Sequence, residues 1–382
     1  MQTRIYQVEW SMQNNNFFGF NRLVIKIGSA LLINNDSTVN KAWLKSIANE
    51  INGLLSNKVE ILIVSSGAVA IGCGIIGKKR TLMNLNELQA AAAMGQAQLV
   101  IEWQDALKEI NVKAAQILLT PDDTENRKRF LNSKNTLQAL LKLSVVPIIN
   151  ENDTVATDEL RYGDNDRLAA RVAQMVMADG LILLSDVDGL YESDPVLNKK
   201  AKHIPKIDSI TDDILIMAGS KESNFGSGGM LTKLHAAKIA MHAGCTTIIS
   251  NGAQDKPISY LMDGGKCSVF KAKESPSIVR KQWLLGFLDT RGILSLDKGA
   301  EEALNQGGSL LPVGLIEVLG NFERGDVVVI TDKKGKEIGK GVTIYSSIEA
   351  SLIRGCRSEA ILQKLGYQGK AEIIHRDDMV LF

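Results

Sequence analysis

The sequence predicts an α/β protein with an open, largely parallel sheet sandwiched by helices, followed by a small β-rich domain. Two observations predict this architecture. Short apolar runs alternate with longer segments of helical periodicity as far as about residue 272, and beyond that point strands are short and glycines frequent. Strands that alternate with helices are typical of βαβ units, in which neighbouring strands run parallel. A chain of 382 residues is long enough for two domains.

Six apolar runs predict the strands of the sheet. They are Leu23–Ile27, Glu60–Val64, Ala114–Leu119, Val145–Ile149, Leu181–Leu184 and Thr246–Ile249. Between them, five segments repeat apolar residues at helical spacing. They are Lys41–Leu55, Glu87–Glu109, Arg129–Leu143, Arg167–Met177 and Leu231–Ala243. We therefore expect one α/β domain over residues 21–272.

The two ends of the chain differ from this domain. Residues 1–20 have neither the basic start nor the apolar core of a signal peptide, so we expect a mobile extension, with Met12 as an alternative start. A polar segment around Pro276 predicts a linker over residues 273–290. Residues 291–382 then form the β-rich domain.

Three short strands are predicted in that domain. Asp326–Thr331 and Ile338–Tyr345 form a hairpin around a turn at Lys334-Gly335, and Ala371–His375 adds another strand.

Composition excludes several classes of protein. The formal net charge of +1 directs the chain neither to nucleic acid nor to anionic membranes. No apolar run approaches the roughly 20 residues of a membrane span. The four cysteines are far apart and have no C-x-x-C spacing, which is typical of reduced thiols in a cytoplasmic protein.

The stretch 145–167 is the strongest candidate for a site. The apolar run Val145–Ile149 stops at Asn150-Glu151-Asn152-Asp153, and Gly163-Asp164-Asn165-Asp166 follows. Ligands of open α/β sheets lie beyond the carboxyl ends of the strands. These carboxylates and amides could bind an ammonium, a carboxylate or hydrated Mg²⁺. The alternative is a plain turn, with Asp164 or Asp166 capping the next helix.

One glycine motif is rejected as a cofactor site. Gly72-Cys73-Gly74-Ile75-Ile76-Gly77 matches the dinucleotide fingerprint G-x-G-x-x-G, which must form the turn between a strand and a helix. Here Ser65-Ser66-Gly67 already supplies that turn, and no acidic residue stands about 20 positions further on at the end of a second strand. A dinucleotide-dependent oxidoreductase therefore remains only as an alternative that requires measurable NAD(P)H binding.

Three other segments are candidate phosphate sites. Lys26-Ile27-Gly28-Ser29 ends the first strand, and Ser65-Ser66-Gly67-Ala68 ends the second. The strongest is Gly226–Lys233, a glycine-rich loop that runs into a helix and could surround phosphate oxygens with its amides. Lys233 near a helix N-terminus opposes the macrodipole, which is better explained by a bound polyanion than by stability. The alternative for the first segment is a lysine that merely ends an edge strand, and for the second it is an ordinary helix cap. For the glycine-rich segment the alternative is a surface loop.

Taken in order, these motifs resemble the amino acid kinase superfamily. They are K-x-G-S, S-S-G-A, N-E-N-D, G-D-N-D, Ser185-Asp186-Val187-Asp188-Gly189-Leu190-Tyr191 and G-S-G-G-M-x-T-K. The resemblance covers Leu23–Phe382, including the ending His375-Arg376-Asp377-Asp378. Within the superfamily, the residues of these motifs are similar to those of one branch. That branch phosphorylates the side-chain carboxylate of L-glutamate with ATP and Mg²⁺, which is the first step of proline biosynthesis. Another acyl-phosphate-forming member of the superfamily is the alternative.

The resemblance implies a role for each matching residue. The catalytic group comprises Lys26 and Lys233, which stabilise the transferring phosphoryl group, and Asp166 and Asp164, which order the lysines. Glutamate is held by Ser66, Asp153 and Asn165, with Asp153 facing its ammonium. The nucleotide contacts Lys26, Ser185, Asp186, Ser227, Gly228, Gly229, Met230, Leu231, Thr232 and Lys233. Ser185 departs from the threonine expected there but keeps the hydroxyl. The Mg²⁺ ligands are unassigned.

The last 92 residues resemble a PUA domain, a fold that elsewhere binds RNA. From Arg291 to Phe382 there are 12 Lys and Arg against 13 Asp and Glu, which gives a net charge of −1. Because RNA binding depends on phosphate neutralisation, RNA is an improbable partner, although an RNA-binding protein with a vestigial kinase domain is an alternative. The resemblance further implies proline as a feedback inhibitor, sensed near Thr120–Phe130, a homo-oligomer, and channelling to the next enzyme of the pathway.

Overall fold

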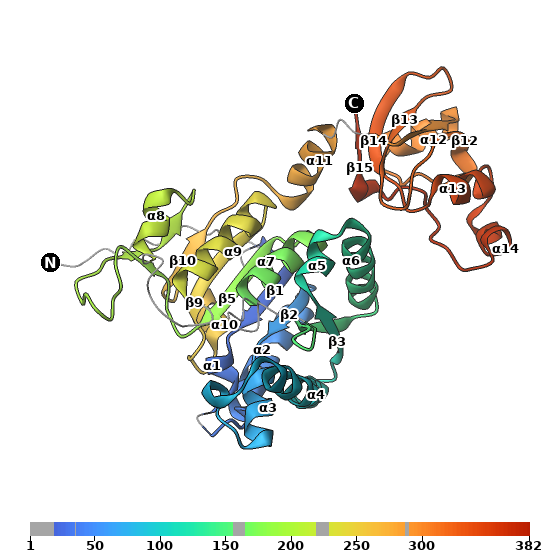
Figure 1. Ribbon diagram of the computed structural model, residues 1–382. Helices are drawn as coiled ribbons and strands as arrows, with labels where there is room; N and C mark the ends of the chain where they lie inside the picture. The colour runs from blue at the N-terminus through green and yellow to red at the C-terminus, as the bar shows by residue number, and fades with distance from the viewer. Residues whose placement is uncertain (1–18, 35, 156–164, 219–228, 287–289) are drawn as a thin grey trace. The chain divides into compact units, whose positions relative to one another are not determined.

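The structure is a computed structural model that describes residues 19–34, 36–155, 165–218, 229–286 and 290–382. The predicted extension over residues 1–20 lies outside them except for Gly19 and Phe20. The chain divides into two compact units between Pro276 and Ser277, at the start of a helix, α11 (Pro276–Gly286), which lies within the predicted linker. Each unit is described by itself (Figure 1).

The first unit is built on an eight-stranded sheet of order β3-β4-β2-β1-β5-β9-β10-β8. The strands are β1 Arg22–Ile27, β2 Glu60–Ser65, β3 Lys113–Leu119, β4 Val145–Glu151, β5 Gly180–Ser185, β8 Lys206–Ile207, β9 Thr246–Asn251 and β10 Cys267–Phe270. From β3 to β9 every neighbouring pair is parallel, whereas β10 runs antiparallel to β9. β6 (Leu190–Tyr191) and β7 (His203–Ile204) form a separate antiparallel pair. The predicted largely parallel sheet and its six strands are confirmed.

Helices cover both faces of this sheet (Figure 1). They are α1 Ser29–Leu32, α2 Lys41–Ser56, α3 Ala68–Ile76, α4 Leu85–Lys108, α5 Pro121–Glu125, α6 Arg127–Lys142, α7 Asn165–Val176, α8 Asp212–Met217, α9 Met230–His242 and α10 Pro257–Met262, with a 3₁₀ turn at Arg80–Leu82. The five predicted helices are confirmed, each with ends within two residues of the predicted ones. No helix in the described ranges has the length and apolar character needed to cross a lipid bilayer.

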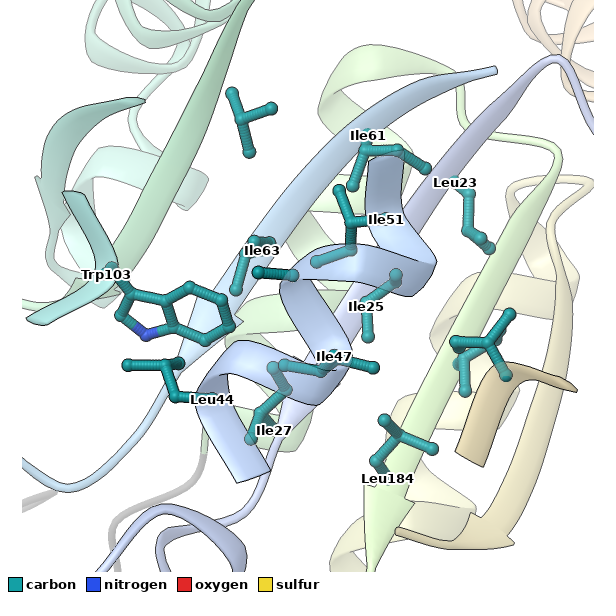
Figure 2. Packing of buried hydrophobic residues seen from close by; sticks show 14 of the residues in the cluster. Leu23, Ile25, Ile27, Leu44, Ile47, Ile51, Ile61, Ile63, Trp103 and Leu184 are labelled. Atoms are coloured by element: carbon teal, nitrogen blue, oxygen red, sulfur yellow. The ribbon is translucent and has the colours of Figure 1, made fainter. Parts of the chain in front are cut away.

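The central strands are largely apolar because both of their faces are buried. Leu23, Ile25 and Ile27 of β1 pack against α2, and Val24 faces the opposite core together with α7 and α9. Figure 2 shows the first of these cores, in which Leu44 and Ile47 of α2 lie over the sheet. Each such side chain contributes about 1.5–3 kcal/mol through burial. The core therefore fixes the strand ends that carry the polar residues.

The rejected dinucleotide motif has a structural role. Gly72 and Gly74 lie inside α3, and Gly77 ends that helix with a φ of +73°. A Cβ atom on Gly72 would lie 1.8 Å from the carbonyl oxygen of Ala91, and one on Gly95 would lie 1.9 Å from that of Ala68. Glycine at both positions lets α3 and α4 pack backbone to backbone. The motif lies in a helix and does not form a strand-to-helix turn, which agrees with its rejection as a dinucleotide site.

The second unit carries a five-stranded sheet of order β12-β11-β13-β14-β15. The strands are β11 Gly292–Leu296, β12 Leu315–Gly320, β13 Val327–Thr331, β14 Glu337–Val342 and β15 Met379–Leu381; the helices are α12 Lys298–Asn305, α13 Ser347–Ile353 and α14 Ile361–Leu365, with 3₁₀ turns at Pro312–Gly314, Ser358–Ala360 and Arg376–Asp378. The β13–β14 hairpin is confirmed.

The predicted strand Ala371–His375 is wrong. Only Ile374 makes an isolated bridge, with Leu310, and the strand that pairs with β14 is β15. Ile373 and Ile374 are both fully buried, but the segment forms no ladder with a neighbouring strand in the described part of the chain. Its apolar pair fills the core of the unit instead.

Candidate active site

Polar side chains gather at the carboxyl edge of the central strands. β4, β2, β1 and β5 are parallel neighbours, so their carboxyl ends meet at one edge of the sheet. Lys26 comes from the end of β1 and Ser66 follows β2. The helices α7 and α9 begin at the same place and add Asp166 and Lys233, which lies within salt-bridge distance of Asp166. Six elements distant in sequence therefore supply one site.

The centre of the site is a buried carboxylate between two ammonium groups. Asp166 Oδ1 lies 2.6 Å from Lys26 Nζ, and its Oδ2 lies 3.1 Å from Lys233 Nζ. The three residues are 1%, 6% and 2% exposed. Burial alone would raise the pKa of Asp166, but the two lysines lower it below its usual value. The hydroxyl oxygen of Thr232 lies 3.0 Å from Asp166 Oδ2.

Such a cluster is suited to an anionic ligand. An ammonium group has three N–H donors, and Asp166 is the one acceptor that Lys26 meets in the described residues. Nearby, the N-cap of α9 is Gly229, which has no side chain to cap the helix, so the first amides of α9 lie free of a side-chain cap at its positive end. Phosphate oxygens would satisfy both sets of donors.

A chain of amide side chains lies beside this cluster. Asn165 Nδ2 donates to Ser66 Oγ at 2.7 Å and to Asn150 Oδ1 at 2.9 Å. Asn150 Nδ2 in turn donates to Gln96 Oε1 at 2.6 Å. The three amide side chains are all less than 10% exposed. Two of their atoms, Asn165 Oδ1 and Gln96 Nε2, meet no hydrogen-bond partner within the described ranges.

Asp153 follows β4 after one residue and is partly buried. Burial raises the pKa of its carboxyl to about 6, while the charge of Arg80 opposes this rise. A carboxylate that is costly to ionise is stabilised by a cation of the ligand. Asp153 is therefore suited to an ammonium group.

A second hydroxyl and carboxylate end β5. Ser185 Oγ donates to Asp186 Oδ1 at 2.9 Å, with Ser185 buried and Asp186 exposed. The carbonyl oxygen of Ser185 accepts from the amide of Gly252 at 2.7 Å, which ties this strand end to the turn after β9.

Comparison with known proteins agrees with this arrangement. Residues 21–251 match the amino acid kinase family and residues 292–365 match the PUA domain. Glutamate 5-kinase of Paramagnetospirillum magneticum is 50% identical over 362 residues, which cover 94% of this chain and 97% of the relative. Glutamate 5-kinase of Nitrobacter hamburgensis is 48% identical over 363 residues, covering 95% and 96%. The chain belongs to the glutamate 5-kinases of the amino acid kinase family.

The resemblance seen in the sequence is thus confirmed for both domains of this glutamate 5-kinase family member. Among solved structures, UMP kinase of Ureaplasma parvum is 21% identical with a TM-score of 0.49, covering 66% of this chain and 98% of that one.

The structure brings most of the predicted site residues together. Lys26, Asp166, Thr232 and Lys233 form one cluster, and Ser66 and Asn165 are hydrogen bonded. Asp164, Ser227 and Gly228 lie outside the described residues, and the roles of all these residues stay predictions.

Two residues of the site were missed. Asn150 directly follows an apolar run, which is a usable signal, but it stands within a polar segment whose members the sequence does not distinguish. Gln96 lies in a run of alanine and glycine on α4, 54 positions from Asn150, and nothing local marks it.

Proposed function

We propose that this protein phosphorylates the side-chain carboxylate of L-glutamate with ATP to give L-glutamyl 5-phosphate and ADP, the first step of proline biosynthesis. The observation that carries the proposal is the pairing of Lys26 and Lys233 through Asp166 at the edge of the sheet. It occurs in a chain that is 50% identical to a glutamate 5-kinase over nearly its whole length.

The chemistry requires little of the protein beyond position and charge. An oxygen of the substrate carboxylate attacks the γ-phosphorus, and the bond from that phosphorus to the bridging oxygen breaks as ADP leaves. Negative charge moves toward the leaving oxygen during this step. Lys26 and Lys233, held in advance by Asp166, stabilise that charge at no cost of reorganisation.

Glutamate is bound by polar residues that follow β2 and β4 and by the first residue of α7. Asp153 pairs with its α-ammonium, and Ser66 and Asn165 hydrogen bond to its polar groups. The raised pKa of Asp153 supports this assignment, because an ammonium would restore the stability that burial of the charge removes.

ATP is bound by the start of α9 and the end of β5. The amides of Gly229 to Thr232 would bind the phosphates, and Ser185 and Asp186 would contact the nucleotide. Ser227 and Gly228, which are also predicted to bind the nucleotide, lie outside the described residues. The uncapped helix start supports this placement.

Mg²⁺ enters with the nucleotide. Within the described ranges, no group of three His, Cys, Asp or Glu side chains could hold a metal ion. Nucleotide-bound Mg²⁺ is typically held by phosphates, waters and one or two carboxylates, and the exposed Asp186 fits that requirement. When bound, the ion neutralises charge on the phosphates.

The activity is tested by trapping the acyl phosphate with hydroxylamine and by coupled ADP release. We expect both signals with glutamate, and their loss in Lys233→Ala. Phosphorylation of N-acetylglutamate or UMP with none of glutamate would place the protein in another branch of the family.

We further propose that the protein forms a homo-oligomer, that it channels the acyl phosphate to the next enzyme of the pathway, and that it is located in the cytoplasm.

We also propose that proline inhibits the enzyme through the segment Thr120–Phe130. This segment includes Asp123, whose carboxylate accepts from the Thr120 amide at 2.8 Å and lies 3.3 Å from Arg129 Nη1. Asp123→Ala would loosen α5 against the start of α6, so we expect weaker proline inhibition. Asp122→Ala, which removes only an exposed partner of Arg129, is the control; unchanged inhibition in Asp123→Ala would contradict the proposal.

The second unit is proposed to have a structural or regulatory role. The net charge of −1 over residues 291–382 gives little attraction to RNA.

A further inference from the structure

The hydroxyl group of Thr232 meets two acceptors at the start of α9. Its Oγ1 lies 2.8 Å from the carbonyl oxygen of Gly229 and 3.0 Å from Asp166 Oδ2. A carbonyl and an ionised carboxylate can only accept, so the single hydroxyl proton serves one of them at a time. The Gly229 carbonyl also accepts the amide of Lys233 at 3.4 Å. Hydrogen bonds to a charged acceptor are the stronger kind, which favours donation to Asp166.

The three groups that contact Asp166 differ in how firmly they are fixed. Lys26 and Lys233 reach the carboxylate by long, flexible side chains, which can follow a carboxylate that moves. The hydroxyl of Thr232 is attached directly to Cβ, and a β-branched side chain is stiff at χ1. Its contact with the Gly229 carbonyl places it against the backbone of its own helical turn. Thr232 therefore fixes the carboxylate of Asp166 relative to the backbone of α9.

The same residue also presents a backbone amide at the helix start. Because Gly229 is the N-cap, Met230, Leu231 and Thr232 occupy the first three positions of α9, whose amides have no acceptor within the helix. These are the amides that the proposed function assigns to the phosphates of ATP. Thr232 thus joins the carboxylate between the two lysines to the part of the backbone that would bind the phosphates.

We propose that Thr232 is a positioning residue for phosphoryl transfer. Its hydroxyl holds the carboxylate of Asp166, and through it Lys26 and Lys233, at a fixed place relative to phosphates bound at the start of α9. This role rests on the proposed function. It differs from a direct contact between the hydroxyl and the nucleotide, which would contribute to the binding of ATP.

Two substitutions of Thr232 distinguish positioning from packing. Thr232→Val keeps the branching and the backbone amide but removes the hydroxyl. We expect kcat to fall roughly tenfold, with KM for ATP and KM for glutamate little changed, because a hydrogen bond to a charged group is lost. Thr232→Ser keeps the hydroxyl and should recover most of kcat. If Thr232 served packing alone, the order would be reversed, because serine lacks the methyl group that valine retains.

A double substitution tests whether the hydroxyl acts through Asp166. In that case, Thr232→Val should lower kcat far less in Asp166→Asn than in the unmodified protein, because changes within one hydrogen-bond network are not additive. Equal fractional losses in both backgrounds would overturn the proposal. A raised KM for ATP with unchanged kcat in Thr232→Val would overturn it too, because that result indicates a direct contact with the nucleotide.

A matched control is available on another helix of the same unit. The hydroxyl of Thr136 donates to the carbonyl oxygen of Asn132 at 3.0 Å on an exposed part of α6, so Thr136→Val should leave kcat unchanged. Melting temperatures verify that each variant is folded. An unmodified protein that fails to phosphorylate glutamate rejects the proposed function, whereas an active one with full kcat in Thr232→Val rejects only the role of Thr232.

Discussion

The substitution Asp166→Asn tests the central cluster most directly. It keeps the size and one acceptor oxygen of the side chain but removes the charge that lies 2.6 Å from Lys26 Nζ and 3.1 Å from Lys233 Nζ. Two buried ammonium groups would then be left facing each other across a neutral amide. Both the stability of the fold and the placement of the lysines should suffer.

The expected magnitude follows from burial. Removing one partner of a buried ion pair costs about 3–5 kcal/mol, because the remaining charge is left uncompensated. All three side chains are less than 10% exposed, so solvent screens them little. For catalysis, losing a preorganised electrostatic contact typically lowers kcat about 100-fold to 1,000-fold. We expect losses in these ranges for unfolding free energy and for kcat.

The pH dependence provides a check on the cause. The ion pairs hold the pKa of Asp166 below its unfolded value, so their contribution is present above the ordinary carboxyl pKa and is lost as pH falls through the folded pKa. The difference in unfolding free energy between the unmodified protein and Asp166→Asn should be full at neutral pH and shrink in acid. Urea denaturation at several pH values measures it.

An exposed ion pair in the same unit is the matched control. Lys45 Nζ lies 2.5 Å from Glu109 Oε2, but the two side chains are 62% and 55% exposed. Glu109→Gln should change the unfolding free energy by less than about 1 kcal/mol and leave kcat unaltered. If Asp166→Asn behaved like this control in both measurements, Asp166 would not order Lys26 and Lys233 for catalysis.

Three further predictions concern other parts of the chain. Burial raises the pKa of Asp153 to about 6, so the stability that the protonated carboxyl provides is lost as pH rises through that value. Asp153→Asn should therefore raise the melting temperature at neutral pH, and should also raise KM for glutamate. An unchanged melting temperature would contradict the burial argument. Gly95→Ala should force α3 from α4 and lower the unfolding free energy by about 1–3 kcal/mol, measured by urea titration. Burial raises the pKa of the Cys267 thiol to about 11 and that of Cys245 further, so a thiol reagent at neutral pH should modify Cys356 before either of them.

The sequence predicted the first unit well because its strands are buried on both faces. A run such as Val145–Ile149 is apolar at every position for that reason, and polar residues begin with Asn150 and Glu151, the last two residues of β4. The second unit was predicted less well. β12 is an exposed strand with a weak pattern, and Ile373 and Ile374 imitate a strand although both side chains enter the core. Local pattern does not distinguish these cases, because tertiary burial decides them.

Site residues could be predicted where chemistry and position coincide in the sequence. Lys26 and Ser66 stand at the ends of predicted strands, and the edge of a parallel sheet brings such ends together. Gln96 has no such mark, since its partner Asn150 belongs to a strand 54 positions away. In the sequence, Gly72 was recognisable only as part of a motif for dinucleotide binding. Its structural role became clear only from the close approach of α3 and α4.

The order of residues at the start of α7 explains why substrate binding and charge stabilisation can be disturbed separately. Asn165 and Asp166 are consecutive, and successive helical side chains point about 100° apart. Asn165 therefore faces Ser66 and Asn150, whereas Asp166 faces the two lysines. A change at Asn165 should act on KM for glutamate, because on the proposed function it alters a contact present in both ground and transition states. Lys26 and Lys233 are proposed to stabilise charge that develops during transfer, so a change at Asp166, which contacts both, should act on kcat.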